Sequence, residues 1–447
     1  MPKSIAADTR PAPNRAKRAA WLLGPALVAG VAYLDPGNVA SNMTAGARYG
    51  YLLVWVVVLG NTMAWLIQYL SAKLGIVTGR SLAETLGERI QNRWGRRAYW
   101  LQAELVAMAT DIAEVIGGAV ALWLLFGVPL LWGGVITGTV SIALLLIQAR
   151  RGTRSFEFVV IGLMLIIALG FTYGVFVAPP DAASVADGLV PRFEGTDSVL
   201  LAASILGATI MPHAIYAHSA LARDRFAPGS TAPQSLARGI GAVDPAHVTA
   251  ERDAVALEGR RGIETARLLR ATKWDVTIAL AIAGTVNLCM LLLAAANLAG
   301  APGTDSLEGA YAALGAGLGP VVATLFAVGL LASGLASTAV GAYAGAEIMQ
   351  GLLKVRIPLL ARRLLTLAPA LVILAIGVDP TLALVLSQVV LSFGIPFALV
   401  PLVALTARRD VLGGFRNRVW TTAAGIAASL FLITLNGVLL WLVFTGG

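Results

Sequence analysis

The feature that most constrains this chain is a series of long apolar segments separated by short polar connections. A helix needs about 20 apolar residues to cross a bilayer, and about eleven segments qualify. With 57% hydrophobic and only 13% charged residues, the chain lacks the composition of soluble domains. We therefore predict an all-α polytopic membrane protein with spans at residues 21–44, 50–76, 98–126, 130–148, 156–178, 198–221, 275–299, 318–352, 358–378, 380–406 and 419–445.

Basic residues predict the orientation of these spans. Apart from Arg48 and Arg192, the 33 Lys and Arg residues lie in or beside the connections on one side. Cytoplasmic loops are enriched in Lys and Arg, so we place this side, with the N-terminal tail 1–20, in the cytoplasm and the C-terminus outside. The net charge of +9 is then a topology signal rather than a sign of nucleic-acid binding. We expect a multi-pass protein of the cell (inner) membrane, surrounded by lipid, and infer no obligate protein partner.

One long polar insertion interrupts the pattern at residues 222–273, where prolines precede a charged run. We interpret it as a flexible cytoplasmic linker, with a regulatory module as the alternative. The single cysteine, Cys289, lies in an apolar span. We therefore expect neither a disulfide framework nor a thiolate metal cluster.

The first span contains the tetrapeptide Asp35-Pro36-Gly37-Asn38. Proline removes a backbone donor and glycine favours open backbone, so the helix should break here. Pro36 would leave the carbonyl of Ala32 without its usual partner, because a helical N–H bonds to the carbonyl four residues earlier. A charged residue inside a membrane is costly and indicates function, so we interpret the break as a cation site.

A second break follows in the span 198–221, at Met211-Pro212-His213, where Pro212 would free the carbonyl of Ala208. Two discontinuous helices in corresponding positions of two repeats indicate a substrate site near the middle of the membrane. The two breaks are one five-helix unit apart. A unit of five helices begins and ends on opposite sides, so we predict inverted repeats at 21–178 and 198–406, with 419–445 as an additional helix.

The residues at the breaks form a mixed ligand set. It comprises the Asp35 carboxylate, the Asn38 carboxamide, the Met211 thioether and one or both freed carbonyls. A thioether is a soft ligand and adds nothing for calcium or magnesium, so the mixture favours manganese or ferrous iron. Gln388 and Asn287, considered alone, are typical of interhelical hydrogen bonding.

The span 98–126 contains Glu104, Asp111 and Glu114. At about 100° per residue, Glu104 and Asp111 differ by roughly 20° and Glu114 lies about 60° further round, so the three share one face. They would line a polar path with Arg362 and Arg363 as partners, and His213 could join it. The alternative is a buried salt-bridge network that only fixes the helices in register.

Together these motifs resemble the Nramp family of proton-coupled manganese and iron transporters, in particular its bacterial manganese-uptake members. The resemblance is carried by Asp-Pro-Gly-Asn at 35–38 and Met-Pro-His at 211–213, and it extends over the runs around Glu104–Glu114 and Gln388. It implies a leucine-transporter-like fold with helices 1 and 6 discontinuous, importing Mn²⁺ or Fe²⁺ with protons by alternating access and without a cofactor. The insertion 222–273 is longer than the resemblance leads us to expect.

The resemblance also implies roles for individual residues. Asp35, Asn38 and Met211 map to side-chain metal ligands, the Ala32 and Ala208 carbonyls join in different states, and Gln388 becomes a ligand in an occluded state. The implied proton pathway comprises Asp111, Glu114, His213, Glu104, Arg362 and Arg363.

Two other classes remain open at this point. One is a transporter of the same fold for an organic cation or an amino acid, in which Asp35 would be a counter-ion. The other is a membrane-embedded enzyme. We disfavour the enzyme because the three histidines form no open metal site and no nucleophile is paired with a base.

Overall fold

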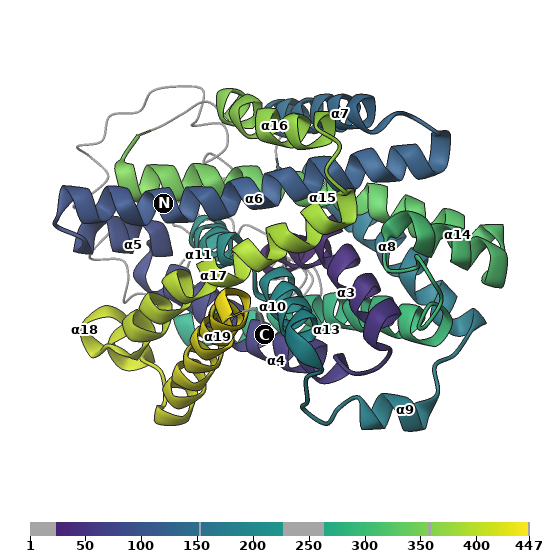
Figure 1. The fold of residues 1–447 in the computed structure, drawn as a ribbon. Helices are drawn as coiled ribbons and strands as arrows, with labels where there is room; N and C mark the ends of the chain where they lie inside the picture. Colours follow the sequence, from purple (N-terminus) through teal and green to yellow (C-terminus); the bar gives the residue numbers. More distant parts are fainter. Residues whose placement is uncertain (1–23, 152, 227–262, 356–358, 446–447) are drawn as a thin grey trace, which may run out of the picture.

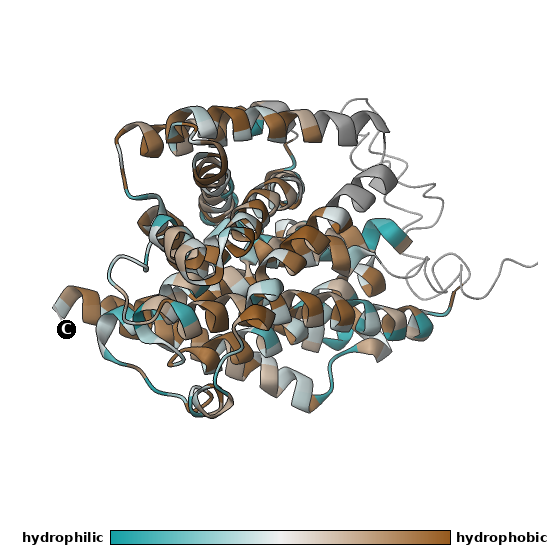
Figure 2. Ribbon diagram, turned by 90° about the vertical axis from the view of Figure 1, so that its right-hand side faces the viewer, coloured by the Kyte–Doolittle hydropathy of each residue, from teal (hydrophilic) through white to brown (hydrophobic). Residues whose placement is uncertain are grey.

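The computed structural model describes residues 24–151, 153–226, 263–355 and 359–445. Within these ranges all regular structure is helical, and each predicted apolar segment contains a helix. Hydrophobic residues occupy most of the helical ribbon, whereas hydrophilic residues gather at the connections (Figure 2). This distribution is that of a protein whose helices are covered by lipid.

Seven helical stretches in the described part of the chain are long and apolar enough to cross a membrane. They are α4 (Val54–Thr78), α6 (Arg93–Phe126), α10 with α11 (Gly195–Phe226), α13 (Thr265–Asn297), α15 (Pro320–Leu353), α17 (Pro380–Ala407) and α19 (Val419–Thr445). The other predicted spans correspond to the broken first helix, α7 (Leu130–Arg151), α8 (Thr153–Val177) and α16 (Leu359–Ala375). Helix α16 is short and carries two arginines, which lower its hydropathy.

The breaks occur at both predicted prolines. The first span divides into α2 (Pro25–Val31), the 3-10 helix η1 (Ala32–Leu34) and α3 (Pro36–Tyr49). The other divides into α10 (Gly195–Ile210) and α11 (Pro212–Phe226). In both cases proline occupies the first position of the second half-helix, where an N–H would have no partner within that half-helix.

The helices pack so that the two broken helices are enclosed. Helices α6 and α15 run side by side across the molecule, and α7 and α16 lie together above α6 (Figure 1). Helix α3 contacts α10, α13 and α17, and α10 packs against α17. Three later helices, α10, α13 and α17, thus pack against the helix that begins at the Asp35 break.

Among the described residues, four short α-helices were not predicted, because hydropathy marks membrane spans rather than helices. They are α5 (Leu82–Arg89), α9 (Ala182–Asp187), α14 (Leu307–Leu318) and α18 (Arg409–Leu412). A local signal existed for α5, since Ser81 and Glu84 form a capping box at its start.

The insertion that we interpret as a linker, 222–273, is helical at both of its ends. Helix α11 continues to Phe226 and α13 already begins at Thr265, because these polar turns extend the apolar helices beyond the predicted membrane boundary. The central part of that insertion and the predicted tail 1–20 lie outside the described residues.

Candidate metal site and charge network

Asp35 lies where η1 ends and α3 begins. Its backbone is extended (φ −72°, ψ 162°), because the following proline disfavours a helical conformation. The carboxylate accepts hydrogen bonds from the Asn38 backbone N–H through Oδ1 at 2.8 Å and from Gln388 Nε2 through Oδ2 at 3.0 Å. Because the side chain is fully buried, a carboxylate is held inside the bundle at the N-terminus of α3.

Gln388, on α17, lies against both broken helices. A methyl group on Gly37 would lie 1.7 Å from Gln388 Nε2, and one on Gly207 would lie 1.9 Å from the Gln388 carbonyl oxygen. A methyl group at either position would overlap Gln388 where it lies in the structure, so α3 and α10 both approach α17 through glycine. Gln388 Oε1 is buried and has no hydrogen-bond partner among the described residues, which leaves it available as a ligand atom.

The Asn38 carboxamide lies in a cluster of buried asparagines. Asn38 Nδ2 donates to the Tyr33 carbonyl and, at 2.8 Å, to Asn287 Oδ1 of α13. Asn38 Oδ1 accepts from Asn42 Nδ2 at 2.6 Å and retains a second lone pair for a cation. Asn287 therefore orients the amide of a predicted ligand, a role that its position in an apolar span did not reveal.

Met211 forms the second break between α10 and α11. It is fully buried, and its backbone has a positive φ of 36°, which costs a non-glycine residue of order 1–3 kcal/mol. Its N–H still donates to the Gly207 carbonyl at 3.3 Å. Gly207 is the residue that packs against Gln388, so Met211 lies one helical turn from that contact. Pro212 follows and carries no N–H, so the Ala208 carbonyl loses its usual helical donor, as the Ala32 carbonyl does at Pro36.

Freed carbonyls at the first break are partly taken by side chains. Asn38 Nδ2 donates to the Tyr33 carbonyl, and Ser333 of α15 donates to the Leu34 carbonyl. Ser41 of α3 and Ser204 of α10 are joined by a hydrogen bond of 2.6 Å. The two broken helices are thus linked directly, beside the contacts that each makes with α17.

The predicted carboxylates of α6 and the arginines of α16 meet in one buried network. Arg363 Nη1 donates to Asp111 Oδ1 at 2.7 Å and to Glu114 Oε2 at 3.2 Å. Arg362 donates through Nε to Glu104 Oε1 at 3.0 Å and through Nη1 to Asp111 Oδ2 at 3.4 Å. Asp111 therefore bridges both arginines. Counting charges, three carboxylates face two guanidinium groups, so one added proton would neutralise the set.

Glycines of α15 make room for this network. A methyl group on Gly345 would lie 2.0 Å from Arg362 Cζ, and one on Gly341 would lie 3.1 Å from Glu114 Oε1. These two glycines thus leave space beside α15 for charged side chains of α6 and α16.

His213 occupies the first turn of α11 and is buried. Its Nδ1 lies 3.1 Å from Thr110 Oγ1, and Thr110 immediately precedes Asp111 on α6. His213 therefore approaches the charge network through Thr110. His218 lies elsewhere, with its Nδ1 2.7 Å from Gln68 Oε1.

Within the described residues, no group of three or more His, Cys, Asp or Glu side chains is arranged to hold a metal. The acids of α6 are engaged by arginines. Asp35 is a single buried carboxylate with the amide side chains of Asn38 and Gln388 nearby.

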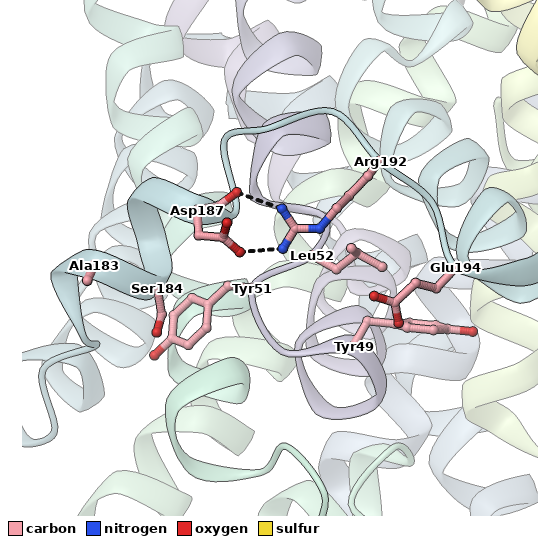
Figure 3. Close-up of a pocket in the computed structure, with 8 residues that line it drawn as sticks. All are labelled: Tyr49, Tyr51, Leu52, Ala183, Ser184, Asp187, Arg192 and Glu194. Atoms are coloured by element: carbon pink, nitrogen blue, oxygen red, sulfur yellow. Dashed lines mark hydrogen bonds and ion pairs between the residues drawn. The ribbon is translucent and has the colours of Figure 1, made fainter.

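A cavity of about 410 Å³ is lined by residues that belong to neither break; these residues are drawn in Figure 3. Arg192 donates through Nη1 to the Asp187 carbonyl at 3.0 Å and forms an ion pair with the Asp187 carboxylate. The cavity is lined by Tyr49, Tyr51, Leu52, Ala183, Ser184, Asp187, Arg192 and Glu194. It contains no predicted site residue.

Comparison with known proteins decides the family. Residues 26–442 match the family described as natural resistance-associated macrophage protein-like, or Nramp. The chain belongs to the Nramp family. It is 55% identical to a divalent metal cation transporter MntH of Mycobacterium tuberculosis (strain ATCC 25618 / H37Rv) over 442 residues, which cover 99% of this chain and 95% of the relative. A MntH of Deinococcus radiodurans is 45% identical over 434 residues, covering 96% and 91% of the two chains.

Solved structures agree with this membership. The Eremococcus coleocola manganese transporter is 32% identical, with a TM-score of 0.77 over 96% of this chain and 88% of that one. MhsT in complex with L-phenylalanine, 13% identical with a TM-score of 0.55 over 94% of this chain and 97% of that one, shows the fold alone. The predicted leucine-transporter-like fold with discontinuous first and sixth helices is confirmed for this Nramp protein, which is a multi-pass membrane protein.

Proposed function

We propose that this Nramp protein imports a divalent transition metal, Mn²⁺ and also Fe²⁺, into the cytoplasm together with protons by alternating access. The observation that carries the proposal is the buried Asp35 carboxylate at a helix break, in contact with Gln388 and beside a second broken helix. The printed names of the relatives, divalent metal cation transporter and manganese transporter, support the same substrate class.

The metal ligands that we assign are the side chains of Asp35, Asn38, Met211 and Gln388 with the carbonyls of Ala32 and Ala208. One carboxylate with amide and carbonyl oxygens suits many divalent cations, whereas the Met211 thioether favours those with affinity for sulfur. The metal and the proton are transported substrates, and no cofactor is required in this scheme.

The proposed proton pathway consists of the α6–α16 network and His213. Its three carboxylates and two arginines differ by one charge, so the network carries one unpaired negative charge when all three acids are ionised and becomes neutral when it gains a proton. The contact of His213 with Thr110 supports its inclusion. The alternative is that this network only fixes α6, α15 and α16 in register.

We place the chain in the cell (inner) membrane, with a cytoplasmic N-terminus and an external C-terminus. The repeats are proposed at 21–178 and 198–406, with 419–445 outside them. The asymmetry of Lys and Arg supports this orientation. In this orientation, metal that is released past α2 and α11 enters the cytoplasm.

Uptake into proteoliposomes tests the proposal. Wild-type protein should admit Mn²⁺ to a dye inside the vesicles, and Asp35→Ala should abolish the signal. The matched control is Glu308→Gln, which removes an exposed acid of α14 and should transport normally. If Asp35→Ala transports Mn²⁺ as well as wild type does, the metal site is wrong. If wild type transports no metal but an organic cation or amino acid, the substrate class is wrong.

A further inference from the structure

The first half-helix, α2, begins in an unusual way. Gly24 has a φ of 144°, which a residue with a side chain rarely adopts, and Pro25 at the first helical position has no N–H. Gly24 has no side chain that could cap the helix. The N–H groups of Gly24 and Ala26 therefore need an acceptor from another part of the chain.

Asp275 supplies that acceptor from α13. Its carboxylate accepts from the Gly24 N–H through Oδ1 at 3.1 Å and from the Ala26 N–H through Oδ2 at 3.0 Å, across about 250 residues of sequence. Only 2% of the Asp275 surface is exposed. A carboxylate at a helix N-terminus satisfies free donors and also interacts favourably with the helix dipole. Asp275 thus caps α2 from a different helix.

The cap matters because α2 has only seven residues. Isolated helices of this length are not stable, so the position of α2 depends on its contacts with neighbours. Its other end leads through Ala32 to the break at Asp35. The second half-helix, α11, is fastened in a different way, since Arg223 forms ion pairs with Glu84 at 2.6 Å and Glu347 at 3.0 Å.

Charged groups near the cap are compatible with a carboxylate there. A methyl group on Gly24 would lie 3.6 Å from Arg225 Nη2, so a guanidinium group adjoins the start of α2. Lys273, two residues before Asp275, instead lies over the Trp65 ring at 5.5 Å. The carboxylate therefore accepts from backbone donors, and a guanidinium group lies beside Gly24 at the same end of α2.

We infer that Asp275 is a positioning residue that holds α2 against α13 and keeps the candidate metal site closed toward the cytoplasm. Opening on that side requires α2 to leave the Asp275 carboxylate. The direction of opening rests on the proposed function and its orientation, whereas the role of the cap in holding α2 does not.

Cysteine accessibility in the full-length protein tests this inference. Cys289→Ala removes the single native cysteine, and Ala29→Cys places a reporter on α2, where the native side chain is 1% exposed. The protein is reconstituted in nanodiscs, and its reaction with N-ethylmaleimide is timed without metal. Asp275→Ala should accelerate labelling about tenfold, as expected for loss of a helix cap. Asp275→Asn keeps one acceptor oxygen, so its labelling rate should lie between the rates measured with Asp275 and with Asp275→Ala.

Two controls separate release of α2 from general loosening. A reporter at Ala370→Cys, buried in α16, should label at an unchanged rate in all Asp275 variants. Asp379→Ala removes another aspartate cap, that of α17, and should leave Ala29→Cys labelling unchanged. Equal acceleration at both reporters, or no acceleration at Ala29→Cys, would overturn the inference. Labelling involves no transport, so a failure here differs from a failure of metal uptake.

Discussion

The contact between Gly37 and Gln388 offers a test that separates the site from the fold. In Gly37→Ala the new methyl group would lie 1.7 Å from Gln388 Nε2, 2.4 Å from Cδ and 2.8 Å from Cγ. The side chain of Gln388 must therefore move, and its hydrogen bond of 3.0 Å to Asp35 is lost. Alanine itself suits this position, because it is a better helix former than glycine.

The size of the effect follows from the interaction that is removed. The displaced Gln388 side chain can no longer serve as the metal ligand that we propose, and a polar interaction with a charged partner contributes about 1.5–3 kcal/mol, which corresponds to about 10- to 150-fold in affinity. We expect the apparent affinity for Mn²⁺ in proteoliposome uptake to fall by an amount in this range. The thermal unfolding midpoint should change little, since the displaced group is one flexible side chain.

A double-mutant cycle makes the prediction specific. The three atoms nearest to the new methyl group all belong to the Gln388 side chain beyond Cβ, so Gln388→Ala removes this obstacle. Gly37→Ala should then have almost no further effect on Mn²⁺ affinity in the Gln388→Ala background. If the two losses instead add, Gly37 acts independently of Gln388 and the proposed arrangement is wrong.

Three further changes test the other parts of the site. Met211→Ala should leave Mn²⁺ uptake measurable but reduce its selectivity over Ca²⁺ and Mg²⁺ in competition assays, because the thioether favours the softer ion; an unchanged selectivity series would exclude a ligand role. The pair Asp111→Asn and Glu114→Gln should slow or uncouple proton flux, measured with a pH-sensitive dye, and normal coupled flux would leave the network a purely structural role. Gly345→Val should displace Arg362 and lower the unfolding temperature by several degrees, whereas an unchanged midpoint would mean that the guanidinium group is easily accommodated elsewhere.

Sequence reasoning succeeded where the determining signal is local. Proline acts on the backbone donor of its own residue and on the conformation of the one before it, so both helix breaks were predictable. Helical periodicity likewise placed Asp111 and Glu114 on one face. Arg362 and Arg363 followed from charge, since buried carboxylates require partners.

The parts that were missed depend on the register between distant helices. Gly37 and Gln388 are about 350 residues apart, and only packing of α3 on α17 reveals that one must be small for the other to reach Asp35. The same holds for Gly345 beside Arg362 and for Asn287 beside Asn38. No local pattern encodes these approaches.

The structure also indicates how the two proposed pathways are connected. A methyl group on Gly117 of α6 would lie 2.0 Å from Pro36 Cβ, and one on Gly334 of α15 would lie 3.5 Å from Pro36 Cγ and 3.0 Å from the Glu114 carbonyl. The proline next to Asp35 is therefore packed directly against α6, one turn from Glu114. Protein interiors are close-packed, so Pro36 cannot move far without moving the helix that carries the carboxylates or sliding along it. Under the proposed function, the metal and proton sites can then influence each other through this contact, without sharing a ligand.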